Sequence, residues 1–314
     1  MKKFKFLSKL LAVLVIVPAI LLCTACGGGQ LAQEAKVDTK GDWANAATVT
    51  TAQFEEYQAT VTGDKAALAK GFHITQKASA MGMKMYGNGY FVAGETPEKN
   101  QLALKYEVEM PAEGDEAALK MAYEMYLKEN HLYIANMDFA TFLAEMNPAL
   151  AERDDLVYNM DIDLGADYGE LSFAEMTSTF TGLMESIGDQ NSYTAVLDMF
   201  GSYADGNDLI IKKIENGTTV KYQITIDATE IETEYGEAAV EKAELYLIFK
   251  DGAFNGAAYN LTGKVTIGET TETIVNEFAI TMFEGNVDFP DFSKYMGFAD
   301  VVGDLTKKML EPAA

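Results

Sequence analysis

The sequence predicts an α+β fold in which a curved antiparallel β-sheet, a half-barrel, packs against inserted helices. Residues 101–110 and 120–128 alternate apolar and polar side chains at a period of two, whereas residues 171–187 place apolar side chains at a helical period. Strand-like and helix-like segments do not alternate one for one, which disfavours a parallel α/β sheet. With 314 residues, of which 48% are hydrophobic, the chain can bury a substantial core.

The clearest strand is QLALKYEVEM, residues 101–110, where every second residue is apolar. Its apolar face consists of Leu102, Leu104, Tyr106, Val108 and Met110. Residues 120–128 repeat the pattern, and their apolar face consists of Met121, Tyr123, Met125 and Leu127. A turn at residues 129–131 leads into a third strand. We therefore expect consecutive antiparallel strands, each with one polar face.

A methionine-rich stretch, AMGMKMYGNGYF at residues 80–91, belongs to the same sheet. It places Met81, Met83 and Met85 at alternate positions, which share one face of a strand. We expect one long strand from Phe72 to Ala93, bent by a bulge near residues 87–89. The Asn-Gly pair in that range is also a hairpin signal, but few strand-forming residues follow it.

Helices are expected at residues 138–146, 171–187 and 192–203, the second with capping-box spacing at its start. Strands return at residues 220–227, 244–267 and 272–283, with hairpin turns at 250–252 and 268–271. Segments 124–130 and 244–252 are faintly alike. This likeness leaves open two related β-units within one domain.

The N-terminus is typical of an export signal. Four lysines within the first nine residues precede an apolar run at residues 10–22, which is short for a transmembrane helix. The following CTACGGG resembles the lipobox of bacterial lipoproteins, which implies cleavage before Cys26 and lipidation of that cysteine. Cys23 departs from the usual apolar residue at its position. The alternative is a plain secretory signal with two incidental cysteines.

Charge excludes one class of partner. Removing the four signal lysines leaves 20 basic and 48 acidic residues, a formal charge of about −28. Such a field repels nucleic acid. Arg153 is the only arginine, so bidentate phosphate recognition has almost no donor. We expect no nucleic-acid binding.

Catalytic chemistry has little support in the sequence. His73 and His131 are the only histidines, and no nucleophile motif or phosphate-binding loop is present, so no enzyme and no cofactor is expected. A weak calcium candidate consists of Asp161, Asp163, Asp167 and Glu170. Because Gly165 occupies the third ligand position of the EF-hand spacing, a plain acidic loop is the favoured alternative, and no metal is assigned.

An early helix at TTAQFEEYQA, the hairpin-like KENHLYIAN and the late NVDFPDFSKY complete a pattern that resembles the lipoprotein-carrier superfamily. That superfamily includes the carriers LolA and LolB and the lipoproteins LprG and LppX. The resemblance implies a curved half-barrel closed by helices around a hydrophobic cavity. We accordingly expect a signal peptide at residues 1–25, a lipidated cysteine and flexible tether at 26–48, and one LolA-like domain at 49–314.

The methionine and aromatic side chains on these strand and helix faces form the candidate lining of that cavity. They are Met81, Met83, Met85, Leu104, Tyr106, Met121, Tyr123, Met125, Phe173, Met176, Phe180 and Met184. Methionine suits sites that accept varied apolar partners, but it also fills ordinary cores. The spacing of apolar residues along the chain is the same whether they line a cavity or fill a core.

Two functions therefore remain after the sequence has been considered. The first is a non-enzymatic extracytoplasmic lipoprotein, anchored to the membrane through Cys26, that binds a lipid or other apolar molecule for transfer or sensing. The second is a surface interaction or structural lipoprotein with a filled core, an acidic exterior and an unidentified protein partner.

Overall fold

The computed structural model describes residues 30–61, 71–80, 82–111, 119–144, 150, 153–165, 209–226, 229–233, 236–267 and 270–310. Its helices are α2 (Thr51–Thr60), α4 (Phe139–Ala144) and α7 (Phe298–Leu310), with 3-10 turns at Pro97–Lys99, Asp154–Leu156 and Phe292–Lys294. Among these described helices, none is long and apolar enough to cross a membrane. Its strands are β1 (Ala47–Val49), β2 (Phe72–Ala80), β3 (Met83–Val92), β4 (Gln101–Met110), β5 (Leu119–Lys128), β6 (His131–Asp138), β7 (Val157–Asp163), β8 (Ile210–Asn216), β9 (Thr219–Ile226), β10 (Thr229–Thr233), β11 (Gly236–Lys250), β12 (Ala253–Ile267), β13 (Thr270–Met282) and β14 (Met296–Gly297).

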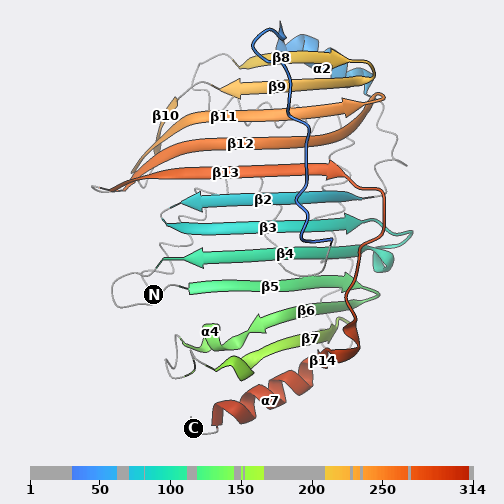
Figure 1. The fold of residues 1–314 in the computed structure, drawn as a ribbon, viewed down its shortest axis with the longest axis vertical. Coiled ribbons are helices and arrows are strands. Elements are labelled where there is room, and N and C mark those ends of the chain that lie inside the picture. Colours follow the sequence, from blue (N-terminus) through green and yellow to red (C-terminus); the bar gives the residue numbers. More distant parts are fainter. Residues whose placement is uncertain are drawn as a thin grey trace.

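The described strands form one curved, open sheet in the order β1-β8-β9-β11-β12-β13-β2-β3-β4-β5-β6-β7-β14, with β10 paired to β11 (Figure 1). All neighbours are antiparallel except β14 and β7. Two meanders, β2 to β7 and β8 to β13, meet where β13 pairs with β2. The described part is thus mainly β, and the curved antiparallel sheet expected from the sequence is confirmed.

One side of the sheet, the apolar face, carries Ile74, Leu104, Ile224, Leu245 and Ile280, which belong to the largest hydrophobic cluster. Helix α2 packs on this face, and its Phe54 ring lies 4.8 Å from the ring of Tyr222. The helix lies where the sequence predicts an early helix, and it begins with a capping box formed by Thr50 and Gln53. The strand faces expected for residues 101–110 and 120–128 are correct, because Leu102 lies opposite Leu127 and Leu104 opposite Met125.

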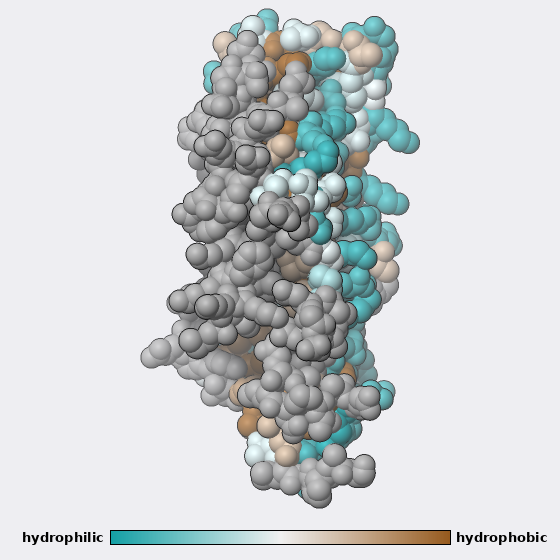
Figure 2. Space-filling model, turned by 90° about the vertical axis from the view of Figure 1, so that its left-hand side faces the viewer, coloured by the Kyte–Doolittle hydropathy of each residue, from teal (hydrophilic) through white to brown (hydrophobic). Residues whose placement is uncertain are grey.

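The other side, the opposite face, is more polar and is crossed by two chain segments (Figure 1). The N-terminal segment, residues 30–46, runs over it from β3 to β8. The C-terminal segment, residues 283–295, packs Phe292 flat against Tyr133 with ring centroids 3.7 Å apart. In Figure 2 hydrophilic side chains gather along the right-hand side, which is the side that faces the viewer in Figure 1.

The N-terminal segment differs from the flexible tether expected at residues 26–48. Leu31 is 2% exposed, and Ala35 is also buried. Trp43 donates its indole N–H to the Thr39 carbonyl and packs against Tyr246, as a packing anchor would. Backbone groups of this segment find hydrogen-bond partners on the sheet, so from residue 30 onward the chain is part of the fold.

The expected long strand at residues 72–93 is wrong. The chain instead forms a hairpin in which Ala80 lies opposite Met83, and Gly82 adopts φ 73° in its turn. Two other turns fall where the sequence predicts them, between β5 and β6 and between β11 and β12. Glu129, Asn130, Asp251 and Gly252 all have positive φ there. The helix expected at 138–146 is found at Phe139–Ala144, whereas those expected at 171–187 and 192–203 lie outside the described residues.

Candidate functional site

The candidate site is the methionine–tyrosine patch, which consists of Met85, Tyr106, Met121, Tyr123 and Met125 on β3, β4 and β5. Strand register brings these side chains together on the apolar face. Met85 and Met121 both lie opposite Val108, and Tyr106 lies directly opposite Tyr123. Cross-strand neighbours of this kind have Cβ atoms about 5 Å apart, so the five side chains form one continuous surface.

Contacts inside the patch orient its polar atoms. The Tyr106 hydroxyl donates to the Met85 sulfur at 3.1 Å, and the Tyr106 and Tyr123 rings meet edge to face with centroids 6.1 Å apart. Burial raises the pKa of Tyr106 to about 12, with Tyr123 adding to the effect. The hydroxyl therefore stays protonated at neutral pH and remains a hydrogen-bond donor.

The patch is less buried than the core side chains farther along the same three strands. Phe91, Leu102 and Leu127 on the same three strands are at most 1% exposed, whereas all five patch residues are only half-buried. The floor between them is open at Gly87, where a Cβ would have only the Lys105 carbonyl oxygen within 4 Å among described atoms. The core is closed on the Leu102 side of the patch, whereas the patch and the half-buried Met83 and Met110 beyond it retain accessible apolar surface.

The predicted lining residues fall into three groups. Met83 and the five patch residues share the apolar face and are half-buried. Leu104 is on the same face but 3% exposed, so it belongs to the closed core. The remaining lining candidates lie outside the described residues, and their roles stay predictions: Met81, Phe173, Met176, Phe180 and Met184. Cys26, the predicted lipidation site, also lies outside them.

Two polar residues on the apolar face are absent from the site residues predicted from the sequence. Gln76 on β2 lies opposite Gly87, and Asn276 on β13 lies opposite Ala78. Asn276 is 4% exposed, and its Oδ1 has no hydrogen-bond partner among the described groups. The sequence does contain a signal for both, because each is a polar residue at an apolar position of the alternation. Gln76 stands between Ile74 and Ala78, and Asn276 stands between Ile274 and Phe278.

The calcium candidate is not assembled by the described residues. Asp161 Oδ1 lies 2.6 Å from His131 Nδ1, and Asp163 accepts a hydrogen bond from the Gly165 N–H. Asp167 and Glu170 lie outside the described residues. Within the described ranges no group of three acidic or histidine side chains is placed to hold a metal ion.

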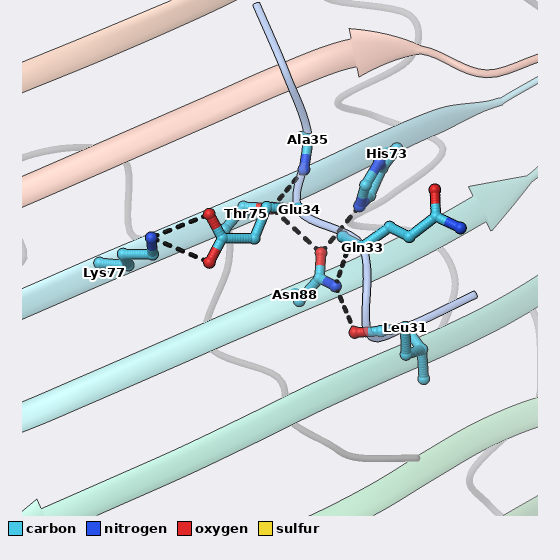
Figure 3. A network of polar contacts seen from close by, with 8 residues as sticks. All are labelled: Leu31, Gln33, Glu34, Ala35, His73, Thr75, Lys77 and Asn88. Atoms are coloured by element: carbon cyan, nitrogen blue, oxygen red, sulfur yellow. Dashed lines mark hydrogen bonds and ion pairs between the residues drawn. The ribbon is translucent and has the colours of Figure 1, made fainter. Parts of the chain in front are cut away.

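His73 belongs to a buried polar network on the opposite face, shown in Figure 3. Its Nε2 lies 2.8 Å from Asn88 Oδ1, which also accepts a hydrogen bond from Thr75. The Asn88 amide donates to the carbonyls of Leu31 and Gln33 at 2.7 and 2.8 Å. Burial lowers the pKa of His73. His73 therefore helps to hold the N-terminal segment on the sheet, because it orients the Asn88 amide that binds this segment.

A shallow depression of about 360 Å³ also opens on the opposite face, across the ends of β13, β2, β3 and β4. Four of its charged side chains form ion pairs: Lys77 with Glu34, Lys84 with Glu109, and Glu107 with Lys105. Mixed and mutually paired charges leave little field for selecting a ligand. This depression is a weaker candidate than the methionine–tyrosine patch.

Comparison with known proteins adds little. No family model matches the chain, and no curated protein matches it. One solved structure that resembles it is the S-type phycobiliprotein lyase CPES from Guillardia theta, at 7% identity and a TM-score of 0.20. The match covers 76% of this chain and 100% of the lyase chain. At that TM-score the likeness supports no inference about this protein.

Proposed function

We propose that this protein is a lipid-anchored, extracytoplasmic lipoprotein that binds a lipid or another apolar molecule at the methionine–tyrosine patch. Its role would be transfer or sensing of that molecule at the cell envelope, without catalysis. The export signal and the lipobox-like sequence before Cys26 support the location. Helices at residues 171–187 and 192–203 would cover the apolar face and close the site, with Phe173, Met176, Phe180 and Met184 opposite the patch.

The half-burial of the patch is the observation that carries this proposal. Methionine and tyrosine side chains of three adjacent strands keep accessible surface, while Phe91, Leu102 and Leu127 on the same strands are closed core. Burying an acyl chain there contributes about 0.8 kcal/mol per methylene, so ten methylenes supply about 8 kcal/mol before the cost of immobilisation. Methionine adapts to such chains because its side chain is unbranched and polarizable.

Ligand capture is tested with the mature chain, exported through a signal that leaves no lipidated cysteine and purified without detergent. Native mass spectrometry followed by organic extraction should reveal a stoichiometric apolar adduct. Met83→Glu and Met125→Glu should abolish the adduct, because a carboxylate in an apolar site is strongly unfavourable. Met296→Glu is the matched control, since Met296 is exposed on β14, and it should retain the adduct. Circular dichroism verifies that all three variants fold.

A clean apo mass that does not change when lipids are offered would contradict ligand binding. It would favour the second function, an interaction lipoprotein with a filled core. The anchor is tested separately by labelling cells with radioactive palmitate. The wild-type chain should incorporate the label and Cys26→Ala should not; equal labelling of the two would contradict lipidation at Cys26.

A further inference from the structure

Asn276 occupies an unusual place on the apolar face. It projects from β13 between two small or apolar neighbours, Ala78 on β2 and Leu261 on β12. It is 4% exposed, yet its Oδ1 meets no donor among the described groups. A buried carbonyl oxygen without a donor is unfavourable, and native structures contain few of them.

The nearest polar group on this face does not relieve that oxygen. Gln76 is diagonal to Asn276 across the β13–β2 pair, a separation of about 7 Å between Cβ atoms. Gln76 has the reach to approach Asn276, but the structure shows no hydrogen bond between the two amides. An apolar face thus contains two neighbouring amides, one of which has an unsatisfied acceptor.

The same row leads directly to the methionine–tyrosine patch. Met85 follows Ala78 on the next strand, and the small side chain of Ala78 is all that stands between Asn276 and Met85 in this row. A chain lying along the patch would therefore reach Asn276 without displacing a large described side chain.

We infer that the ligand is an amphiphile whose apolar chain lies on the methionine–tyrosine patch and whose hydroxyl or amide N–H donates a hydrogen bond to Asn276 Oδ1. This inference rests on the proposed function and narrows its ligand class. A site with a buried acceptor discriminates strongly against an analogue that lacks the donor, because binding the analogue leaves the acceptor unpaired. A purely apolar site would not make this distinction.

The test compares two lipids that share an oleoyl chain, monooleoylglycerol with two hydroxyl donors and methyl oleate with none. Each displaces the fluorescent probe N-phenyl-1-naphthylamine from the mature chain, at concentrations below lipid aggregation. The wild-type protein should bind monooleoylglycerol at least tenfold more tightly than methyl oleate. Asn276→Leu should bring the two affinities within twofold, because monooleoylglycerol loses its hydrogen bond and methyl oleate no longer leaves an acceptor unpaired.

Asn260→Leu is the matched control. Asn260 lies on β12 and is half-buried, but it projects from the opposite face beside Glu277, so the tenfold preference should remain. Asn276→Ala is the second variant if leucine does not fit, and it should also lose the preference.

The outcomes separate the two proposals. If the probe binds and both lipids displace it with equal affinity, the ligand site stands and the role of Asn276 is overturned. If Asn276→Leu and Asn276→Ala keep the preference, the role is overturned as well. If neither the probe nor either lipid binds the wild-type chain, the proposed function itself fails.

Discussion

Replacing Asn88 by alanine should release the N-terminal segment from the sheet. The Asn88 side chain is 2% exposed and makes four hydrogen bonds, two as acceptor and two as donor. Its donors hold the carbonyls of Leu31 and Gln33, and its acceptor orients Thr75 (Figure 3). Thr75 in turn accepts a hydrogen bond from the Ala35 N–H at 2.8 Å. One side chain therefore links two strands to the segment.

The expected loss of stability in Asn88→Ala follows from the number of polar groups that lose their hydrogen-bond partner. Each net hydrogen bond contributes about 1 kcal/mol, and a buried group left unpaired costs about 1–3 kcal/mol. Undocking lets water reach the Leu31 and Gln33 carbonyls, which reduces that cost. It also exposes the buried Leu31 side chain, worth about 2 kcal/mol. We expect Asn88→Ala to lower the free energy of unfolding by about 3 kcal/mol.

Urea unfolding followed by circular dichroism measures this change, and hydrogen exchange locates it. The Ala35 amide should lose protection in Asn88→Ala, since its acceptor Thr75 loses its own partner. Glu34→Gln is the control within the same segment. Glu34 pairs with Lys77 at 2.9 Å where both side chains are 43% exposed, so its loss should cost less than about 1 kcal/mol.

Two results would refute this reasoning. One is an Asn88→Ala protein whose stability equals that of Glu34→Gln. The other is unchanged exchange at Ala35, which would mean that the segment stays docked without the amide. The first result would return residues 30–46 to the flexible tether that the sequence predicts, and the second would assign the docking of this segment to contacts other than those of Asn88.

Three further predictions concern buried groups elsewhere. Burial raises the pKa of Glu124 to about 7, so its neutral form stabilises the fold at low pH. That stability should be lost as the pH rises from about 4.5 through 7. In Glu124→Gln the urea midpoint of unfolding should therefore fall less over this pH range than in the wild-type protein. Equal pH dependence of the midpoint in the two proteins would contradict the raised pKa of Glu124. Gln58 Nε2 on α2 is buried without a described acceptor, so Gln58→Leu should raise the unfolding free energy by about 1 kcal/mol, and a lower melting temperature would oppose this. Phe54 is 0% exposed beside Tyr222, so Phe54→Ala should cost about 3–5 kcal/mol in the same assay; a loss below about 1 kcal/mol would show that α2 does not hold the core.

Strand faces were the most predictable feature. Alternation at period two assigns each side chain of residues 101–110 to a face, and burial of one face fixes the register. Turn chemistry was predictable where the residues were specific, as at Asp251 and Gly252, which both adopt positive φ. These features depend on neighbours in sequence.

The β2–β3 hairpin was not predictable in the same way. Its turn contains Gly82 and follows no Asn-Gly pair. The Asn88-Gly89 pair on β3 serves long-range packing instead. The Asn88 amide binds the N-terminal segment, and a Cβ at Gly89 would clash with Leu104. Both uses depend on partners far along the chain, so a local motif pointed to the wrong turn.

The N-terminal segment shows the same limit. Its composition, with glycines followed by small and charged residues, is typical of a linker. Its docking depends on Asn88, which lies 57 positions from Leu31. A short segment with one buried leucine has no periodic signal of its own, so only the assembled sheet shows where it binds.

Leu104 and Tyr106 show why sequence could place the patch on a face but could not tell core from site. They are two residues apart on one face of β4, and both are apolar positions of the same alternation. Leu104 lies opposite Gly89 and fills the space above it, whereas Tyr106 lies opposite Gly87, where among described atoms only a backbone oxygen is near. Two glycines with the same spacing therefore have opposite consequences, because one is covered by its cross-strand neighbour and the other is not. The open glycine, the half-buried methionines beside it and the unpaired Asn276 acceptor arise from pairing across four strands. Ligand discrimination at Asn276 thus tests a property of the assembled sheet that no single strand encodes.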